Sequence, residues 1–307
     1  MKGFHIPLLV TGVIAFGAWC VASAASAGFT EPGKSPTLPS QIRIDWPKPE
    51  SAILATHYFG RHWATNFISA FRREDVASDF AKIRGDGFNT VIFVVSWSDF
   101  QPVIDPCCTY DQRAFQRLRF LIDKALEARL QVILRIGYLW TYRPGAEDVG
   151  HRMQQLVDQE RARAAFMQYV QRLADEVRHD RHVVMTFLAW EDHFPERFDP
   201  QEQTTIDRWL ESQPTSGGGG PPSFPLRRDG DDVRTYHRYW DWLAINELLA
   251  PARALLPHLS YEVRIDKEPV FDPTDETRRK VIEWIDHDGM YQLPGDGPIT
   301  IYWAPFW

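Results

Sequence analysis

The chain contains 307 residues, of which 44% are hydrophobic and 24% are charged. This composition is typical of a globular protein and excludes a disordered chain, a collagen-like chain and a polytopic membrane protein. The net charge of -7 argues against nucleic acid as the main partner. Aromatic residues make up 13% of the chain and include 12 Trp. Such a surplus can fill a large core or line a groove that binds a flat ligand.

The N-terminus has the pattern of a secretory signal peptide. Lys2 gives a positive start, residues 6–22 form an apolar run, and the small residues Ala25 and Ala27 follow at the spacing of a cleavage site. We therefore expect residues 1–27 to be removed on export, which predicts a secreted or periplasmic protein without a membrane span after cleavage. An uncleaved anchor is the alternative. Residues 28–50 are rich in Pro and are expected to form an extended entry segment.

From residue 51 onward, short apolar runs alternate with amphipathic segments. Strands are predicted at 53–59, 90–96, 131–136, 183–190, 260–265 and 299–303, and helices at 73–86, 111–128, 147–178 (one or two), 240–256 and 275–286. This alternation is typical of an α/β fold with a parallel sheet, and it predicts a TIM (β/α)8-type barrel over residues 51–307. A doubly wound fold is less favoured because no G-x-G-x-x-G turn follows the first predicted strand.

Two segments interrupt the alternation between the fourth predicted strand and its helix. Residues 196–210 are polar with a short helix, and residues 212–232 are rich in Gly and Pro. Because this connection belongs to the C-terminal face of a parallel barrel, we expect the inserted loop 196–232 to cap a groove there. Residues 158–181, rich in Arg and Glu, are expected to present a solvated outer helix face.

Aromatic and polar residues cluster where the predicted strands end, which is where barrel enzymes carry their chemistry. Such a cleft suits sugar rings, because their C–H faces stack on aromatic rings and their hydroxyls bind polar groups. For Trp97 and Trp140 a place in the core is the alternative, and Arg135 has the alternative of an ion pair inside the barrel. The predicted substrate-binding residues are His57, Trp97, Arg135, Tyr138, Trp140, His193, Tyr302 and Trp303.

The fourth predicted strand runs into two adjacent carboxylates, Glu191 and Asp192. Their alternative role is to cap a helix or to pair with an Arg. Nucleotide-phosphate and nucleophile-elbow motifs are absent, and the His residues lack H-E-x-x-H spacing, so we expect neither a cofactor nor a metal. Cys107 and Cys108 are adjacent, so pairing them with each other cannot staple a long loop.

The order of these segments resembles a known family. Gly87-Phe88-Asn89 leads into a strand, Trp97 and Gln101-Pro102 follow, and a later strand ends near Arg135. This order is similar to that of the retaining (β/α)8 glycoside hydrolases of the cellulase, mannanase and β-galactosidase superfamily. The resemblance implies that Glu191 is the general acid/base, with Asp192 as the alternative acid. The chain departs from the family at Trp190, where an Asn normally precedes the acid/base.

The second carboxylate of such an enzyme is harder to place. In the family it is a Glu at the end of the seventh strand, whereas only six strands are predicted here. Two interpretations stay open. The chain is incomplete at its C-terminus, or a carboxylate near the fifth predicted strand acts, with Glu262 and Glu268 as the candidates.

These observations together predict an exported glycoside hydrolase that acts on O-glycosidic bonds of a polysaccharide or oligosaccharide. The alternative is a non-catalytic carbohydrate-binding protein on a degenerate barrel. A barrel enzyme of another chemistry, such as a metal-dependent deacetylase or a lyase, is a third hypothesis, but no cluster of metal ligands supports it.

Overall fold

A computed structural model describes residues 52–62, 67–104, 109–138, 149–188, 195–213, 222–228, 233–256, 259–264, 268–272, 274–277, 279–285 and 300–302. The expected signal peptide, the Pro-rich entry segment and the two adjacent cysteines lie outside these residues. No described helix is both long enough and apolar enough to cross a membrane.

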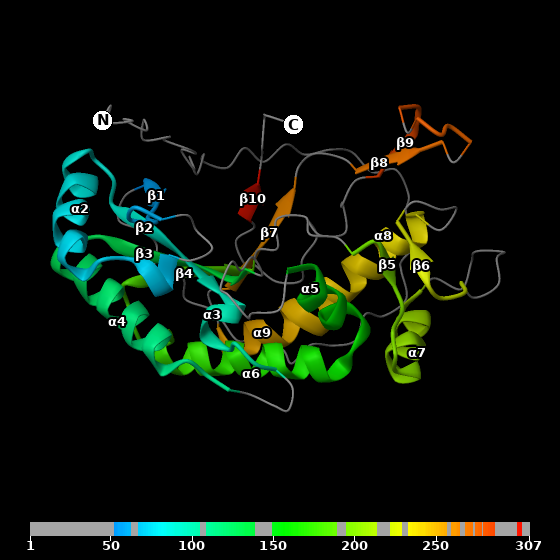
Figure 1. The fold of residues 1–307 in the computed structure, drawn as a ribbon, viewed down its shortest axis with the longest axis horizontal. Helices are drawn as coiled ribbons and strands as arrows, with labels where there is room; N and C mark the ends of the chain where they lie inside the picture. Colours follow the sequence, from blue (N-terminus) through cyan, green and yellow to red (C-terminus); the bar gives the residue numbers. More distant parts are fainter. Residues whose placement is uncertain are drawn as a thin grey trace, which may run out of the picture.

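The centre of the fold is a six-stranded parallel sheet (Figure 1). Its strands lie in the order β1-β2-β3-β4-β7-β10, and every neighbouring pair is parallel. Strand order therefore equals chain order, as in a barrel, whereas a doubly wound sheet reverses its order at a switch point. This confirms the α/β, barrel-type class. The strands are β1 (Ala55–His57), β2 (Thr90–Ser96), β3 (Gln131–Tyr138), β4 (Val183–Leu188), β7 (Leu259–Arg264) and β10 (Thr300–Tyr302).

Helices cover one face of this sheet (Figure 1). The predicted helices at 73–86 and 111–128 are α2 (Arg73–Gly85) and α4 (Gln112–Glu127), and the segment 147–178 forms α5 (Val149–Asp158) and α6 (Glu160–Val177). The segment 240–256 lies in a continuous helical stretch of α8 (Val233–Leu243), the π-helix η2 (Ala244–Leu249) and α9 (Ala250–Leu255). The short helices α1 (Phe67–Ala70) and α3 (Trp97–Phe100) complete this layer.

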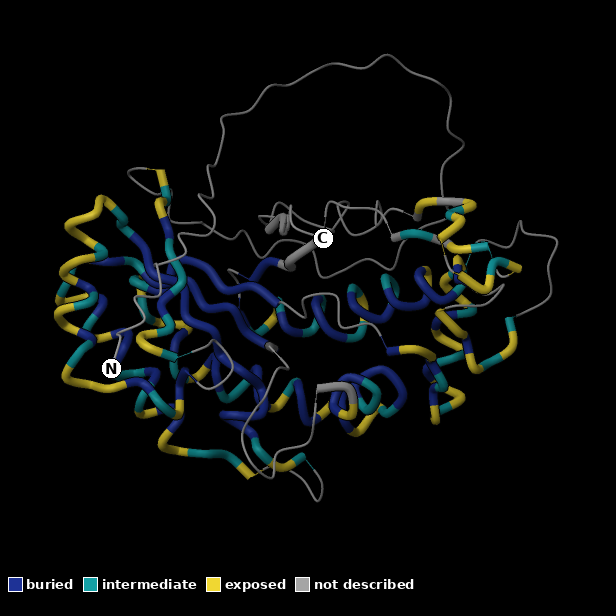
Figure 2. The backbone as a smooth tube through the Cα atoms, turned by 45° about the horizontal axis from the view of Figure 1, so that its top comes forward, coloured by how far each residue is buried: buried dark blue, intermediate teal, exposed yellow. Residues whose placement is uncertain are grey.

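The two faces of the sheet carry different cores, because successive side chains of a strand point to opposite faces. Val91, Phe93 and Val95 of β2 pack with the helices in the main core. Ile92 belongs instead to a smaller cluster made of strand residues, on the face that a barrel encloses. Strands β2 and β4 are buried along their whole length, and Figure 2 shows buried strands at the centre of the fold. The members of the smaller cluster are Ala55, Ile92, Ile133, Val184, Met185 and Phe187.

Helices α2 and α4 end in the same way before entering β2 and β3. At each end a residue with positive φ follows the C-cap: Gly87 (φ 94°) after α2 and Arg129 (φ 58°) after α4. The amide of Phe88 donates to the carbonyl of Ile83 at 3.2 Å, and that of Leu130 donates to Ala125 at 2.8 Å. These are Schellman motifs, which satisfy the last helical carbonyls and turn the chain back toward the sheet.

The predicted helix at 275–286 is wrong. The chain forms an antiparallel hairpin of β8 (Glu268–Phe271) and β9 (Val281–Ile285). Asp272 accepts hydrogen bonds from the backbone and hydroxyl of Thr274, and Asp275 accepts from the amides of Thr277 and Lys280. These side-chain contacts to local backbone groups compete with helix formation and favour the turn.

The insertion after β4 contains regular structure. Strands β5 (Arg197–Phe198) and β6 (Leu226–Arg227) pair antiparallel, and α7 (Gln203–Ser212) contacts α8. Phe198 stacks on Tyr236 of α8 with ring centroids 4.0 Å apart. Aromatic packing of this kind fixes the insertion to the helical layer.

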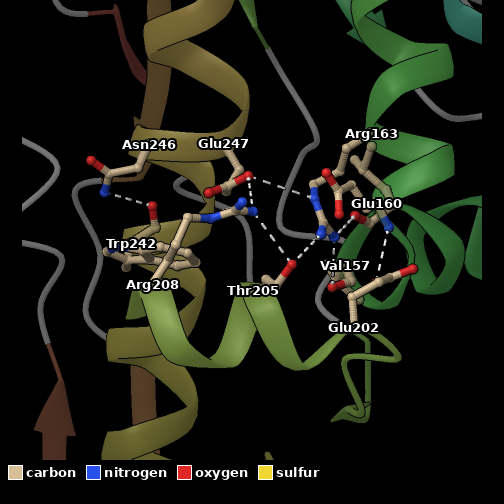
Figure 3. Close-up of polar contacts among 10 residues, drawn as sticks. Val157, Glu160, Arg163, Glu202, Thr205, Arg208, Trp242, Asn246 and Glu247 are labelled. Carbon is tan, nitrogen blue, oxygen red and sulfur yellow. Dashed lines mark hydrogen bonds and ion pairs between the residues drawn. The ribbon is translucent and has the colours of Figure 1, made fainter. Parts of the chain in front are cut away.

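A buried arginine joins the insertion to α6 and η2 (Figure 3). The Arg163 guanidinium donates to the carbonyls of Leu156 and Val157 at 3.2 Å and to the Thr205 hydroxyl at 2.9 Å. Glu247 lies 4.0 Å from Arg163 Nε and 3.1 Å from Arg208 of α7. The expectation of a solvated outer face for residues 158–181 is therefore wrong at Arg163, which is 3% exposed.

Candidate functional site

The candidate site lies at the C-terminal edge of the parallel sheet, toward which all six strands point. Among the predicted site residues, the side chains of His57, Trp97 and Arg135 are described. For Tyr138, Glu262 and Tyr302 the structure places the backbone alone. The remaining predicted residues, Trp140, Glu191, Asp192, His193 and Trp303, lie outside the described residues.

The structure brings His57 and Arg135 together on the inner face of the sheet. His57 ends β1, and Arg135 lies on β3, where it pairs in register with Val94 on one side and Phe187 on the other. Arg135 is 6% exposed. Two residues that are far apart in the sequence thus place polar groups above the apolar inner cluster.

The His57 imidazole is held neutral by its surroundings. Its Nε2 atom is fully buried and has no hydrogen-bond partner among the described residues, although the residue as a whole is only half-buried. Burial, followed by the positive charge of Arg135, lowers the pKa of His57 to about 3. The ring also stacks on Phe59 at 5.4 Å between centroids. A neutral imidazole offers one donor and one acceptor, and the guanidinium beside it offers donors in a planar fork.

Trp97 occupies the core rather than a groove. Its side chain is fully buried, its indole Nε1 donates to Gln101 Oε1 at 2.6 Å, and its ring meets Phe166 edge-on at 5.1 Å. The Arg152 guanidinium lies 4.9 Å from the ring centroid. The physical reason is that α3 begins directly after β2, which carries Trp97 toward the helical layer. The alternative of a core position is the one the structure shows.

A bulge between β2 and β3 shapes the edge of the site. Val95 pairs with Ile136, but Ser96 pairs with Tyr138, so Gly137 (φ 74°) is the extra residue. The Tyr169 hydroxyl of α6 donates to the Val95 carbonyl at 2.8 Å and lies 3.5 Å from the Gly137 amide, from which it accepts. Burial raises the pKa of Tyr169, so the hydroxyl keeps its proton.

Sequence reasoning missed this role of Tyr169. The available signal was Gly137, because a single Gly within an apolar strand often marks a bulge. Nothing in the helix pattern distinguishes Tyr169 from an ordinary core residue. Arg152 was missed as well: it is fully buried and donates to the carbonyls of Gln101 and Pro102 at 3.0 and 2.7 Å.

The two candidates for a second carboxylate occupy different parts of the fold. Glu262 lies in β7 of the parallel sheet, where its backbone pairs in register with Thr300 of β10. Glu268 begins β8 and therefore belongs to the hairpin, outside the six-stranded sheet. Of these two candidates, Glu262 lies on a strand of the parallel sheet and Glu268 does not. In the part of the chain that the structure describes, no three His, Cys, Asp or Glu side chains form a group able to hold a metal ion.

The comparisons with known proteins concern the fold. No protein-family model matches the chain, and no curated protein matches it. Solved structures to which the chain is similar include an exo-beta-1,4-mannosidase from Opitutaceae bacterium strain TAV5, with 18% identity, a TM-score of 0.41, and coverage of 68% of this chain and 30% of that one. The chain is also similar to a GH5_18 protein from Streptomyces cattleya in complex with GlcNAc. The identity is 14%, the TM-score is 0.43, and the match covers 69% of this chain and 45% of that one.

A beta-glucosidase from Trichoderma harzianum is similar at 15% identity, with a TM-score of 0.38 and coverage of 67% of this chain and 40% of that one. The chain thus spans less than half the length of these three structures. TM-scores in this range describe only a partial likeness. The barrel-type class rests instead on the order of the strands in the sheet.

Proposed function

We propose that the chain is an exported glycoside hydrolase that cleaves O-glycosidic bonds in a polysaccharide or oligosaccharide. The observation that carries the proposal is the His57–Arg135 pair on the inner face of a singly wound parallel sheet. A neutral imidazole on a half-buried residue and a buried guanidinium suit sugar hydroxyls better than they suit a hydrophobic ligand.

Glu191 is the proposed general acid/base. It follows the described end of β4 by three residues in the sequence, and strand four supplies this group in the family that the sequence resembles. In its acid form Glu191 gives its proton to the glycosidic oxygen as the C–O bond breaks, and the leaving sugar departs as an alcohol. In the retaining course the second carboxylate bonds to the anomeric carbon in this step, and the Glu191 carboxylate then accepts a proton from a water whose oxygen bonds to that carbon as the bond to the second carboxylate breaks. In the inverting course the second carboxylate accepts the proton of a water that attacks the anomeric carbon directly.

Glu262 is the proposed second carboxylate, on the strength of its place in β7. A separation of about 5–5.5 Å from the first carboxyl would make it a nucleophile with retention of configuration, and about 6.5–9.5 Å would leave room for water and give inversion. His57 and Arg135 would bind hydroxyls of the sugar, together with Tyr138, Trp140, His193, Tyr302 and Trp303.

The test compares the full chain with its Glu191→Gln and Asp192→Asn variants on soluble β-linked manno- and gluco-oligosaccharides. Glu191→Gln should lower kcat by about 10²–10⁴ with little change in KM, because proton transfer in the transition state is lost while ground-state contacts remain. Asp192→Asn is the matched control and should keep most of the activity. Circular dichroism would verify that both variants fold.

The opposite pattern, with activity lost in Asp192→Asn and kept in Glu191→Gln, would transfer the acid role to Asp192. A wild-type chain that binds these sugars without hydrolysing them would favour the second candidate function, a carbohydrate-binding protein on a degenerate barrel. The observation that favours this second function is that Trp190 stands before Glu191 where the family has an Asn.

A further inference from the structure

The β8–β9 hairpin exposes large apolar side chains. Phe271 is 40% exposed, and Ile282 and Trp284 are each 55% exposed. In Figure 1 the hairpin stands apart from the parallel sheet. Single exposed apolar residues are ordinary. Several on one short hairpin indicate a surface that binds a ligand or a partner.

Most of these side chains share one face of the hairpin. Pro269 pairs directly with Trp284, and Phe271 and Ile282 each lie two residues from one of them on their own strands. Because side chains alternate along a strand, Pro269, Phe271 and Trp284 belong to the same face. The register shift beside Phe271 makes Ile282 the extra residue of β9, next to these three. We call Pro269, Phe271, Ile282 and Trp284 the hairpin strip.

Several hydrogen bonds link the described residues of the turn between the two strands. Lys280 Nζ donates to Asp272 at 2.5 Å, and the amides of Arg279 and Lys280 donate to Asp275 at 3.1 and 2.8 Å. Hydrogen bonds, with the Thr277 hydroxyl first, lower the pKa of Asp275 to about 2, so its carboxylate stays charged and keeps accepting. A preformed surface loses little conformational entropy on binding.

The size of the strip indicates the kind of ligand. A stable protein interface takes about 20–30 residues and about 800 Å² from each partner, whereas β8 and β9 contain 4 and 5 residues. A narrow, flat ligand fits better. The C–H faces of a sugar stack on indole, and the exposed Lys280 at the turn offers hydroxyl groups a hydrogen-bond partner.

We propose that the hairpin strip binds a polysaccharide chain at a second site, with Trp284 as the stacking platform. This proposal deepens the proposed function, on which it rests for the substrate class. The site would hold an insoluble polymer at the protein surface while the sheet edge carries out hydrolysis. Soluble short oligosaccharides would reach the sheet edge without it.

The experiment uses the full chain and two variants, Trp284→Ala and the matched control Leu54→Ala, which removes another exposed apolar side chain outside the hairpin. Two quantities are measured: retention on insoluble mannan and on cellulose, and hydrolysis of soluble manno- and gluco-oligosaccharides. We expect Trp284→Ala to lower retention on at least one polymer by tenfold or more while hydrolysis of the soluble substrates stays within twofold. Leu54→Ala should leave both quantities as in the wild type.

The outcomes separate the two proposals. Retention that depends on Trp284 without any hydrolysis would support the strip and overturn the proposed function. Hydrolysis of soluble substrate without Trp284-dependent retention on either polymer would overturn the strip alone. A concentration-dependent dimer that Trp284→Ala abolishes, seen by sedimentation velocity, would also overturn the strip, because a second copy would then be its occupant.

Discussion

At the scale of single residues, the two helix ends before β2 and β3 form a natural comparison. Gly87 and Arg129 occupy the same position of the same motif, and both have positive φ. A side chain in this conformation brings its Cβ too close to the following carbonyl, whereas Gly has no Cβ. Arg129 therefore bears a strain that Gly87 avoids.

Exchanging these residue types should change stability in opposite directions. We expect Arg129→Gly to raise the free energy of unfolding by about 0.5–1 kcal/mol and Gly87→Ala to lower it by about 1–2 kcal/mol. A Cβ built at Gly87 meets no atom within 4 Å, so its cost comes from the backbone alone. Urea titrations of both variants measure the two changes, and a shift of the same sign in both would contradict this explanation.

His57 gives the second prediction at this scale. Its pKa is about 3 in the folded chain and about 6.5 in an unfolded one, so between these values the unfolded chain binds more protons. The neutral ring therefore makes its full contribution to the free energy of unfolding above pH 6.5, and this contribution is lost as the pH falls toward 3. The loss is at most about 1.4 kcal/mol per pH unit.

The measurement is the free energy of unfolding of the wild type and of His57→Asn between pH 7 and pH 4. The wild type should lose its advantage over the variant as the pH falls, since Asn does not titrate. A difference that stays constant over this range would mean that His57 has the same pKa in the folded chain as in the unfolded chain.

At the scale of elements, Arg163 shows how one side chain joins three segments. It binds the junction of α5 and α6, the Thr205 hydroxyl of α7, and Glu247 of η2 (Figure 3). Pro251 follows η2 and lacks the amide that a regular helix would bond to Glu247. The π-helix η2 lies directly before this region of the chain, and it carries Glu247.

Replacing the two arginines of this network should have unequal costs. We expect Arg163→Met to lower the free energy of unfolding by about 2–4 kcal/mol, because it leaves buried carbonyls without a donor. Arg208→Met is the matched control: its side chain is 45% exposed, so its ion pair should contribute less than about 1 kcal/mol. Equal effects in chemical denaturation would show that Glu247, and not the buried carbonyls, governs the stability.

Local patterns predicted most elements, because burial imposes a period on the sequence. The β-branched run 90–96 forms β2 with the predicted bounds, and the apolar spacing after Asp111 forms α4. The segment 275–286 failed because its turn depends on side chains that bond backbone groups, which periodicity does not register. The prediction that Arg163 lies on an exposed face failed for a related reason. Its partner Thr205 comes from a segment far away in the sequence.

At the scale of the whole molecule, chain order alone predicted the sheet. Helices on one face of the sheet connect β1 to β2, β2 to β3, β3 to β4 and β4 to β7, and each of these strands lies beside the previous one. The location of the aromatic surplus could not be predicted in this way. Trp97, Trp209 and Trp240 are buried in the core, whereas Trp284 is exposed on the hairpin. A position directly after a strand does not determine toward which face of the sheet a side chain points. The Trp97 side chain points toward the helices.

The same limit applies to the candidate site. The strand-end rule selected His57 and Arg135, and the fold places them near each other because β1 and β3 flank the same strand. Their mutual effect on charge could not be read from the sequence, because it depends on burial. The proposed carboxylates Glu191 and Glu262 stay predictions that the kinetic test decides.

The bulge between β2 and β3 has a consequence for how this sequence can evolve. The Tyr169 hydroxyl donates to the Val95 carbonyl and accepts from the amide of the extra residue, Gly137. Loss of the hydroxyl alone would remove a hydrogen bond from each of two backbone groups, and loss of the extra residue alone would remove the donor to the hydroxyl. Sequences that evolve from this one should therefore keep both Tyr169 and the extra residue Gly137, or lose both. A side chain on α6 and the length of β3 are then expected to change together.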